Sequence, residues 1–167
     1  MLGFSRTKWV GVERPDRETF FAHGVLEDNI YGMELDVWVK APEFVITGIE
    51  GKMRRVTTPV CEQAIPVLKN ALGLAITAPD LISAVNRKVG REGCRHFANL
   101  LLECCDAVLR CAFFEGWSER KRKGAAINPD TYLQEQIKNF PDLKNSCYTL
   151  SNAGEQSERS QSKKNDH

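Results

Sequence analysis

Hydrophobic and polar residues alternate along the first third of the chain, and apolar residues recur at helical spacing after it. Residues 32–40, GMELDVWVK, alternate most clearly. Leu35, Val37 and Val39 fall on one side of an extended strand, and the other side carries Trp38 and charged residues. This pattern predicts a half-buried strand of an antiparallel sheet.

Three further segments predict strands, at Thr7–Arg14, Glu18–Asp28 and Phe44–Met53. Short turn sequences containing Pro, Asp or Asn separate them, and strands joined this way form a meander. Gly48 and Gly51 in the last segment indicate a bulge or bend. His23 shares a strand face with Phe21 and Val25, and we interpret it as a core or sheet-surface histidine with its hydrogen bond satisfied.

Apolar residues then recur at helical spacing in three segments, Thr58–Gly73, about Pro79–Val89 and Arg91–Phe114. Thr58 is a good N-cap, Pro59 suits the first helical position, and Pro66 should kink the first helix. A shorter helix is predicted from an Asn128-Pro-Asp130 cap to about Asn139. The predicted fold class is α+β, an antiparallel β-meander of about four strands packed by three main helices.

Residues 1–150 are predicted to form a single α+β domain, and residues 151–167 a disordered polar tail with little to bury. The basic run Arg120–Lys123 is interpreted as a solvated helix end or linker. At 167 residues the chain is long enough to bury about two-thirds of its unfolded surface.

Composition and charge narrow the partners and the location that we expect for the protein. A net charge of +1 gives no overall reason to expect nucleic acid or an anionic membrane as a partner, and no apolar run is long enough to span a bilayer. The N-terminus lacks a signal peptide, so the expected location is cytoplasmic. The six cysteines should then be reduced, as core thiols, metal ligands or reactive thiols.

Two cysteines fall at predicted helix starts. Cys61 lies near the start of one helix and Cys94 in the first turn of another, with His96 two residues on. A helix N-terminus lowers a thiol pKa, and the thiolate is the form that both metal binding and nucleophilic sulfur chemistry require. The alternative is that these thiols are buried as small hydrophobic groups. We interpret the three mid-helix cysteines in that way: Cys104, Cys105 and Cys111.

Several stretches resemble an uncharacterised bacterial family, domain of unknown function 2889. They are residues 32–53, the Pro59-Val-Cys61 turn, residues 72–76, residues 89–96 and Asn145-Ser-Cys147. The resemblance covers roughly residues 5–150. The "G-C-x-H" turn typical of the family stands here as Gly93 to His96. Cys147 matches a cysteine of the family's "N-x-C-H" stretch, with Tyr148 in place of the histidine.

The layout is more distantly similar to the iron–sulfur scaffold fold of the NifU and IscU type. Those proteins have a meander, a helix opened by a cysteine, and a later helix opened by a cysteine beside a histidine. Cys61 and Cys94 would occupy these two places, whereas residues 29–33 lack the cysteine found before the first core strand of those scaffolds.

Three hypotheses follow. The first is a metal or sulfur-handling site of Cys61, Cys94, His96 and Cys147, which would suit zinc or an iron–sulfur cluster. The second is thiol chemistry without metal, in which Cys94 or Cys61 accepts a persulfide sulfur or an acyl group and His96 is the general base. The third is an interaction module that binds a protein partner through residues 117–124 and the tail. A conventional enzyme is least favoured, because no catalytic triad or phosphate-binding glycine loop is found.

Overall fold

The computed structural model describes residues 3–141, 144–145 and 147–152. It divides into two compact units, Met1–Cys111 and Ala112–His167. The α+β class predicted from the sequence is confirmed, because an antiparallel sheet is followed along the chain by helices. The predicted single domain over residues 1–150 stays a prediction. Most of the predicted tail, residues 153–167, lies outside the described residues.

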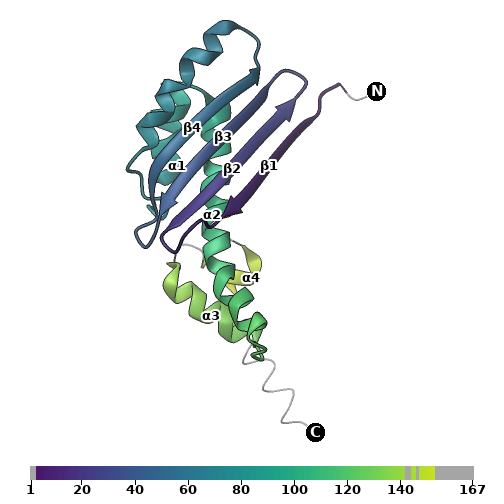
Figure 1. Cartoon of the computed structure of the whole chain (residues 1–167), viewed down its shortest axis with the longest axis vertical. Helices are drawn as coiled ribbons and strands as arrows, with labels where there is room; N and C mark the ends of the chain where they lie inside the picture. Colours follow the sequence, from purple (N-terminus) through teal and green to yellow (C-terminus); the bar gives the residue numbers. More distant parts are fainter. Residues whose placement is uncertain (1–2, 142–143, 146, 153–167) are drawn as a thin grey trace. The chain divides into compact units, whose positions relative to one another are not determined.

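The first unit is built on a four-stranded antiparallel sheet with the order β1-β2-β3-β4. Its strands are β1 (Arg6–Glu13), β2 (Thr19–Asp28), β3 (Gly32–Lys40) and β4 (Val45–Arg55), as Figure 1 shows. Each strand pairs with its neighbour in the chain, so the predicted meander is confirmed. The bounds of β3 are those that the alternating pattern predicts.

A β-bulge interrupts the pairing of β3 with β4. Trp38 lies opposite Gly48, but Val39 lies opposite Ile46, which leaves Thr47 as the extra residue. Gly51 serves another purpose, because a Cβ atom there would lie 2.3 Å from Leu68 Cδ1. The glycine therefore permits close packing of the sheet against the segment that follows it.

The first five helical segments after the sheet are η1 (Pro59–Ala64), η2 (Pro66–Ala71), α1 (Leu81–Val85), η3 (Asn86–Arg91) and α2 (Arg95–Arg122). The predicted α-helix over 58–73 is wrong, since η1 and η2 are two 3₁₀ helices. Pro66 has no N–H to donate, and it begins η2 instead of kinking a continuous helix. The predicted stop is confirmed at Gly73, whose φ is +81°.

The second predicted helix also differs, because α1 is short and continues as the π-helical turn η3. The third begins at Arg95, later than predicted, and extends to Arg122. The basic residues Arg120 to Arg122 therefore form its exposed last turn, in agreement with their interpretation as a solvated helix end.

One face of the sheet packs against these helices. A Cβ atom at Gly24 would lie 2.8 Å from Cys104 Sγ and 3.1 Å from Leu100 Cγ, so α2 crosses β2 in close contact. The core between them is apolar, with Leu35, Val37 and Val39 at 0% exposure. The other face of the sheet is left uncovered by the helices of this unit (Figure 1).

The second unit contains the end of α2 together with α3 (Pro129–Asn139) and α4 (Tyr148–Ser151). The predicted cap of α3 is confirmed, because Asn128 Oδ1 accepts hydrogen bonds from Asp130 N and Thr131 N. Phe113, Tyr132 and Leu150 form its buried core. Among the described helices, none is long and apolar enough to cross a membrane.

Candidate functional site

Cys94 lies in the turn between η3 and α2. Its N–H and that of Gly93 both donate to the carbonyl oxygen of Val89, at 2.9 and 3.1 Å. Its own carbonyl accepts the first helical hydrogen bond, from Ala98 N at 3.0 Å. Cys94 therefore occupies the N-cap position of α2, one residue before the helical turn in which the sequence places it.

Glycine at position 93 permits this turn. A Cβ atom there would lie 2.9 Å from the side chain of Val67 and 3.0 Å from the Val89 carbonyl oxygen. The first contact could adjust, but the second is to a backbone oxygen that already accepts hydrogen bonds from Gly93 N and Cys94 N. The Gly93-Cys94 sequence thus places the thiol at the helix start while the turn packs against η2.

His96 brings its imidazole beside the thiol. Its Nδ1 atom lies 3.9 Å from Cys94 Sγ, within range of a sulfur hydrogen bond. The ring is half-buried and packs on the ring of Tyr31, with the two centroids 4.3 Å apart. Tyr31 belongs to the turn between β2 and β3, so the sheet limits the rotation of the imidazole.

Arg6 approaches the other imidazole nitrogen, with its Nη2 atom 3.5 Å from His96 Nε2. A guanidinium group can only donate, so Nε2 must be the acceptor. The proton of the neutral ring is then on Nδ1, and it faces Cys94 Sγ. This geometry makes His96 a hydrogen-bond donor to the sulfur.

Asp28 holds Arg6 in place. Arg6 Nη2 lies 2.6 Å from Asp28 Oδ2, and the other carboxylate oxygen accepts hydrogen bonds from Ile30 N and Tyr31 N at 2.7 and 2.6 Å. Burial alone would raise the pKa of Asp28. The N–H groups of Tyr31 and Ile30, together with Arg6, outweigh it and lower that pKa to about 2.

The charge state of His96 follows from its surroundings. Burial lowers the pKa of His96 below its usual 6.5, and the positive charges of Arg6 and Arg95 lower it further against the opposing effect of Asp28. The imidazole is therefore neutral at physiological pH, which agrees with a single proton on Nδ1.

Cys61 lies at the same end of the sheet, where β4 ends and η1 begins. Its Sγ atom is 3.6 Å from Thr57 Oγ1 and 3.8 Å from Thr58 Oγ1. Hydrogen bonds from these hydroxyls lower the pKa of the Cys61 thiol, and the Thr57 hydroxyl has the larger effect. The sequence predicts that Thr58 caps the helix, but its side chain makes no capping hydrogen bond. Its hydroxyl contacts the Cys61 sulfur instead.

The remaining cysteines lie elsewhere. Cys104 and Cys105 are buried in the core of the first unit, which confirms their interpretation as packing residues, and Cys111 is half-buried. Cys147 is exposed, belongs to the second unit and precedes α4. Its role as a ligand stays a prediction.

The predicted metal site gains no support from the described residues. No three His, Cys, Asp or Glu side chains among them come together in a group that could hold a metal ion. The structure pairs Cys94 with His96 and brings Cys61 to the same end of the sheet. Zinc or an iron–sulfur cluster on Cys61, Cys94, His96 and Cys147 remains a prediction.

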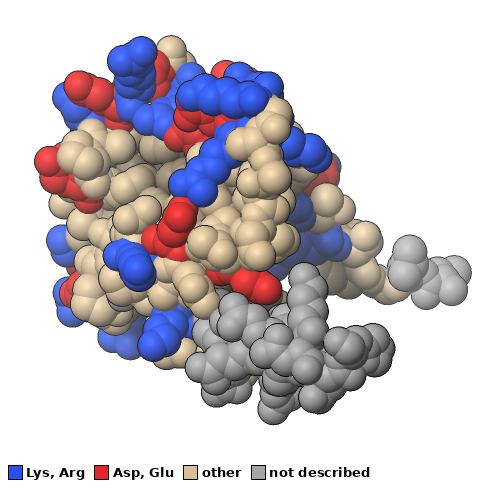
Figure 2. All heavy atoms as spheres, turned by 90° about the horizontal axis from the view of Figure 1, so that it is seen from below, with Lys and Arg blue, Asp and Glu red and all other residues tan. Residues whose placement is uncertain are grey.

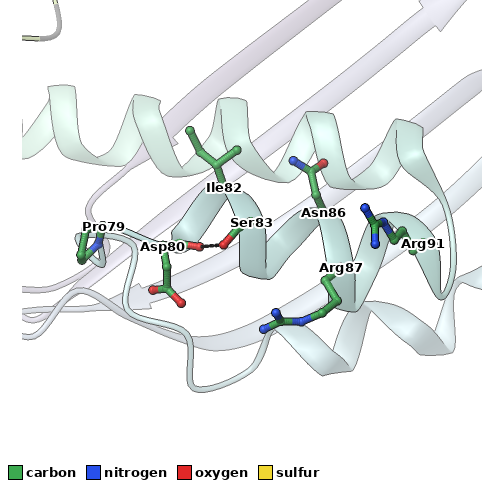
Figure 3. Close-up of a pocket in the computed structure, with 7 residues that line it drawn as sticks. All are labelled: Pro79, Asp80, Ile82, Ser83, Asn86, Arg87 and Arg91. Atoms are coloured by element: carbon green, nitrogen blue, oxygen red, sulfur yellow. Dashed lines mark hydrogen bonds between the residues drawn. The ribbon is translucent and has the colours of Figure 1, made fainter.

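A hollow of about 530 Å³ lies beside α1 and η3 and contains none of the predicted site residues (Figure 3). Its lining is Pro79, Asp80, Ile82, Ser83, Asn86, Arg87 and Arg91. Three of these residues are charged. Arg87 and Arg91 are basic and exposed, and Asp80 is acidic. Basic and acidic side chains both occur on the face of the protein shown in Figure 2, interspersed with other residues.

Cys94 and His96 are predicted site residues, whereas their neighbours Tyr31, Arg6 and Asp28 are not predicted from the sequence. These three lie far from the Gly93–His96 turn along the chain, and the meander brings them to it. The one available signal was Asp28-Asn29, which marks a turn and thereby the end of the sheet to which the site belongs.

Comparison with known proteins yields one match. Residues 13–110 match the model of a family described as protein of unknown function (DUF2889). This is more than half of the chain but shorter than the 5–150 span that the sequence stretches indicated. It includes Cys61, Cys94 and His96 and ends before Cys147. No curated protein and no solved structure matches, so the distant likeness to NifU and IscU scaffolds gains no support.

Proposed function

The chain belongs to the DUF2889 family, and we propose that it is a sulfur-handling protein whose Cys94 accepts a sulfur atom from a persulfide donor. The observation that carries the proposal is the 3.9 Å approach of His96 Nδ1 to Cys94 Sγ. A single cysteine at a helix start would be weak support. Here the imidazole is also oriented, by Tyr31 on its face and Arg6 on its other nitrogen.

The reaction is a sulfur transfer between thiols. The Cys94 thiolate attacks the outer sulfur of a donor R–S–SH, the S–S bond breaks, and the donor leaves as R–S⁻ with the electron pair. The leaving thiolate takes up the proton that Cys94 released to solvent. The products are the Cys94 persulfide and R–SH, with no net oxidation or reduction.

His96 assists as a hydrogen-bond donor. With Nε2 turned to Arg6, the Nδ1–H group stabilises the thiolate before attack and the persulfide anion afterwards. This differs from the sequence hypothesis, in which His96 acts as a general base. A base would need a free Nδ1 lone pair, which the Arg6 contact disfavours.

The test is incubation of the reduced protein with glutathione persulfide, followed by intact mass spectrometry and peptide mapping. The proposal expects a mass increase of one sulfur atom, located on Cys94. Cys94→Ser should abolish it. Cys61→Ser is the matched control, because Cys61 lies at the same end of the sheet and hydrogen bonds from Thr57 and Thr58 lower the pKa of its thiol.

Retention of the added sulfur in Cys94→Ser, or its location on Cys61 in the wild-type protein, would contradict the proposal. Zinc and iron should be measured on the same preparation. A stoichiometric metal lost in both Cys94→Ser and Cys61→Ser would favour the metal-site hypothesis over sulfur transfer.

A further inference from the structure

The uncovered face of the sheet carries aromatic side chains at its centre. We call Trp9, Phe21 and Trp38, with His23 and Asp36 between them, the aromatic platform. The strand register places all five on one face, since Trp9 pairs with Val25, Phe21 with Trp38 and His23 with Asp36. Figure 1 shows this face turned away from the helices of the first unit.

Both tryptophans lie over glycines of the sheet. The six-membered ring of Trp9 covers Gly11, where a Cβ atom would come within 2.6 Å of it, and Trp38 lies over Gly48, where the corresponding distance is 2.9 Å. Trp9 is 56% exposed, which is unusual for so large an apolar side chain.

The polar centre of the platform is ordered. His23 Nδ1 and Asp36 Oδ1 are 2.6 Å apart, and Trp9 contacts His23 edge-on with ring centroids 6.0 Å apart. Phe21 and Trp38 pack together on the other side, at 5.1 Å. These contacts hold the rings in place before any ligand binds, which reduces the entropy lost on binding.

The charge at the platform is negative. Glu13 lies opposite Phe21, and Glu50 lies opposite Asp36, so three carboxylates border the aromatic rings. Within the described part of the chain, neither Glu13 nor Glu50 forms an ion pair. The nearby bases Arg54 and Lys40 are paired with Glu34 and Glu18 instead, and Lys52 lies opposite Glu34.

We propose that the aromatic platform binds a protein segment that presents arginine or lysine side chains. A cation is attracted to the face of an indole, and a neighbouring carboxylate strengthens the attraction. The same carboxylates disfavour nucleic acids and anionic lipids, because like charges repel. Charge complementarity therefore selects a basic polypeptide among the ligands that a flat aromatic surface could accept.

The experiment titrates the full-length protein with capped tetra-arginine and tetra-lysine peptides and follows binding by isothermal titration calorimetry at low salt. Capped tetra-glutamate is the control ligand. Saturable binding of the basic peptides alone is expected. Trp9→Ser and the double variant Glu13→Lys/Glu50→Lys should each weaken it at least tenfold. All three side chains are exposed, so these variants should fold, and circular dichroism checks this.

Glu62→Lys is the matched charge control. Glu62 is exposed on η1, outside the platform, and its substitution raises the net charge by two units, in the same direction as the four-unit change of the double variant. It should leave the affinity within about twofold of wild type. Equal loss in Glu62→Lys and in a platform variant would overturn the proposal, because binding would then reflect net charge alone.

Two further results would also overturn it. One is the absence of saturable binding by either basic peptide at millimolar concentration. The other is a dimer in sedimentation velocity that Trp9→Ser converts to monomer, since a second copy of the chain would then be the occupant.

Discussion

Cys94 and the pair Cys104 and Cys105 belong to the same helix, yet their surroundings are opposite. Cys94 lies at the N-cap of α2, half-buried, with an imidazole N–H facing its sulfur. Cys104 and Cys105 are 0% and 2% exposed in the core. Burial raises the pKa of each of these two thiols to about 12, with nearby negative charges contributing.

The surroundings of each cysteine therefore depend on its position along the helix. At the helix start, backbone N–H groups are unpaired and a polar neighbour can approach. In the helix middle, every N–H is already bonded within the helix, and the Cys104 side chain faces the sheet at Gly24. The contact between Cys104 and the sheet is close, because Gly24 has no Cβ atom and so leaves room for Cys104 Sγ.

The largest expected contrast is in reactivity. With pKa values of about 12, Cys104 and Cys105 should alkylate roughly 10³-fold more slowly than an ordinary thiol near neutral pH. Cys94 should react at least as fast as an ordinary thiol. Pulse labelling with iodoacetamide and peptide mass spectrometry measures both rates. Labelling of Cys104 at the rate of Cys94 in the folded protein would remove the contrast.

Substitution should affect the free energy of unfolding in the reverse order, more at Cys104 than at Cys94. Cys104→Ser places a hydroxyl in an apolar site and is expected to lower the free energy of unfolding by about 2 kcal/mol. Cys94→Ser should change it by less than about 0.5 kcal/mol, because serine is itself a good N-cap. Urea denaturation followed by tryptophan fluorescence compares the two. A larger loss for Cys94→Ser would show that Cys94 is chiefly a packing residue.

The contribution of His96 to Cys94 should be smaller. Removing the Nδ1–H donor in His96→Leu is expected to slow sulfur transfer to Cys94 about tenfold, as a hydrogen bond to a charged group is lost. Arg6→Leu should give a weaker effect of the same sign, because it frees the ring to adopt the other tautomer. Rates measured with excess glutathione persulfide distinguish the two. An unchanged rate in His96→Leu would mean that the imidazole only packs against Tyr31.

The smallest effect concerns pH. Because the folded pKa of His96 lies below 6.5, the unfolded chain binds its proton more readily than the folded one. This contribution to stability is therefore complete above pH 6.5 and declines as pH falls from 6.5 towards the folded pKa. Urea midpoints at several pH values should fall less steeply in His96→Gln than in wild type. Identical slopes would show that His96 titrates alike in both states.

Local patterns predicted much of the fold because strand and turn signals act over short distances. The alternation of residues 32–40 predicted β3 with its bounds, and Asn128 predicted the cap of α3. The prediction for residues 58–73 was wrong in kind. Apolar spacing there suits an α-helix, but Pro59 and Pro66 begin separate segments, and hydrogen bonds such as Ile65 N to Glu62 O close 3₁₀ turns.

Local sequence patterns are enough to predict the meander and the presence of helical segments after it. They also place Cys94 close to His96, because neighbours in the chain cannot lie far apart. The surroundings of these two residues, in contrast, depend on the tertiary structure. The meander returns the chain so that Arg6, Asp28 and Tyr31 reach the turn at Cys94, and this contact sets the proton on His96 Nδ1. The same folding leaves Trp9 and Trp38 on the uncovered sheet face, because period-two alternation assigns residues to faces but does not say which face the helices cover.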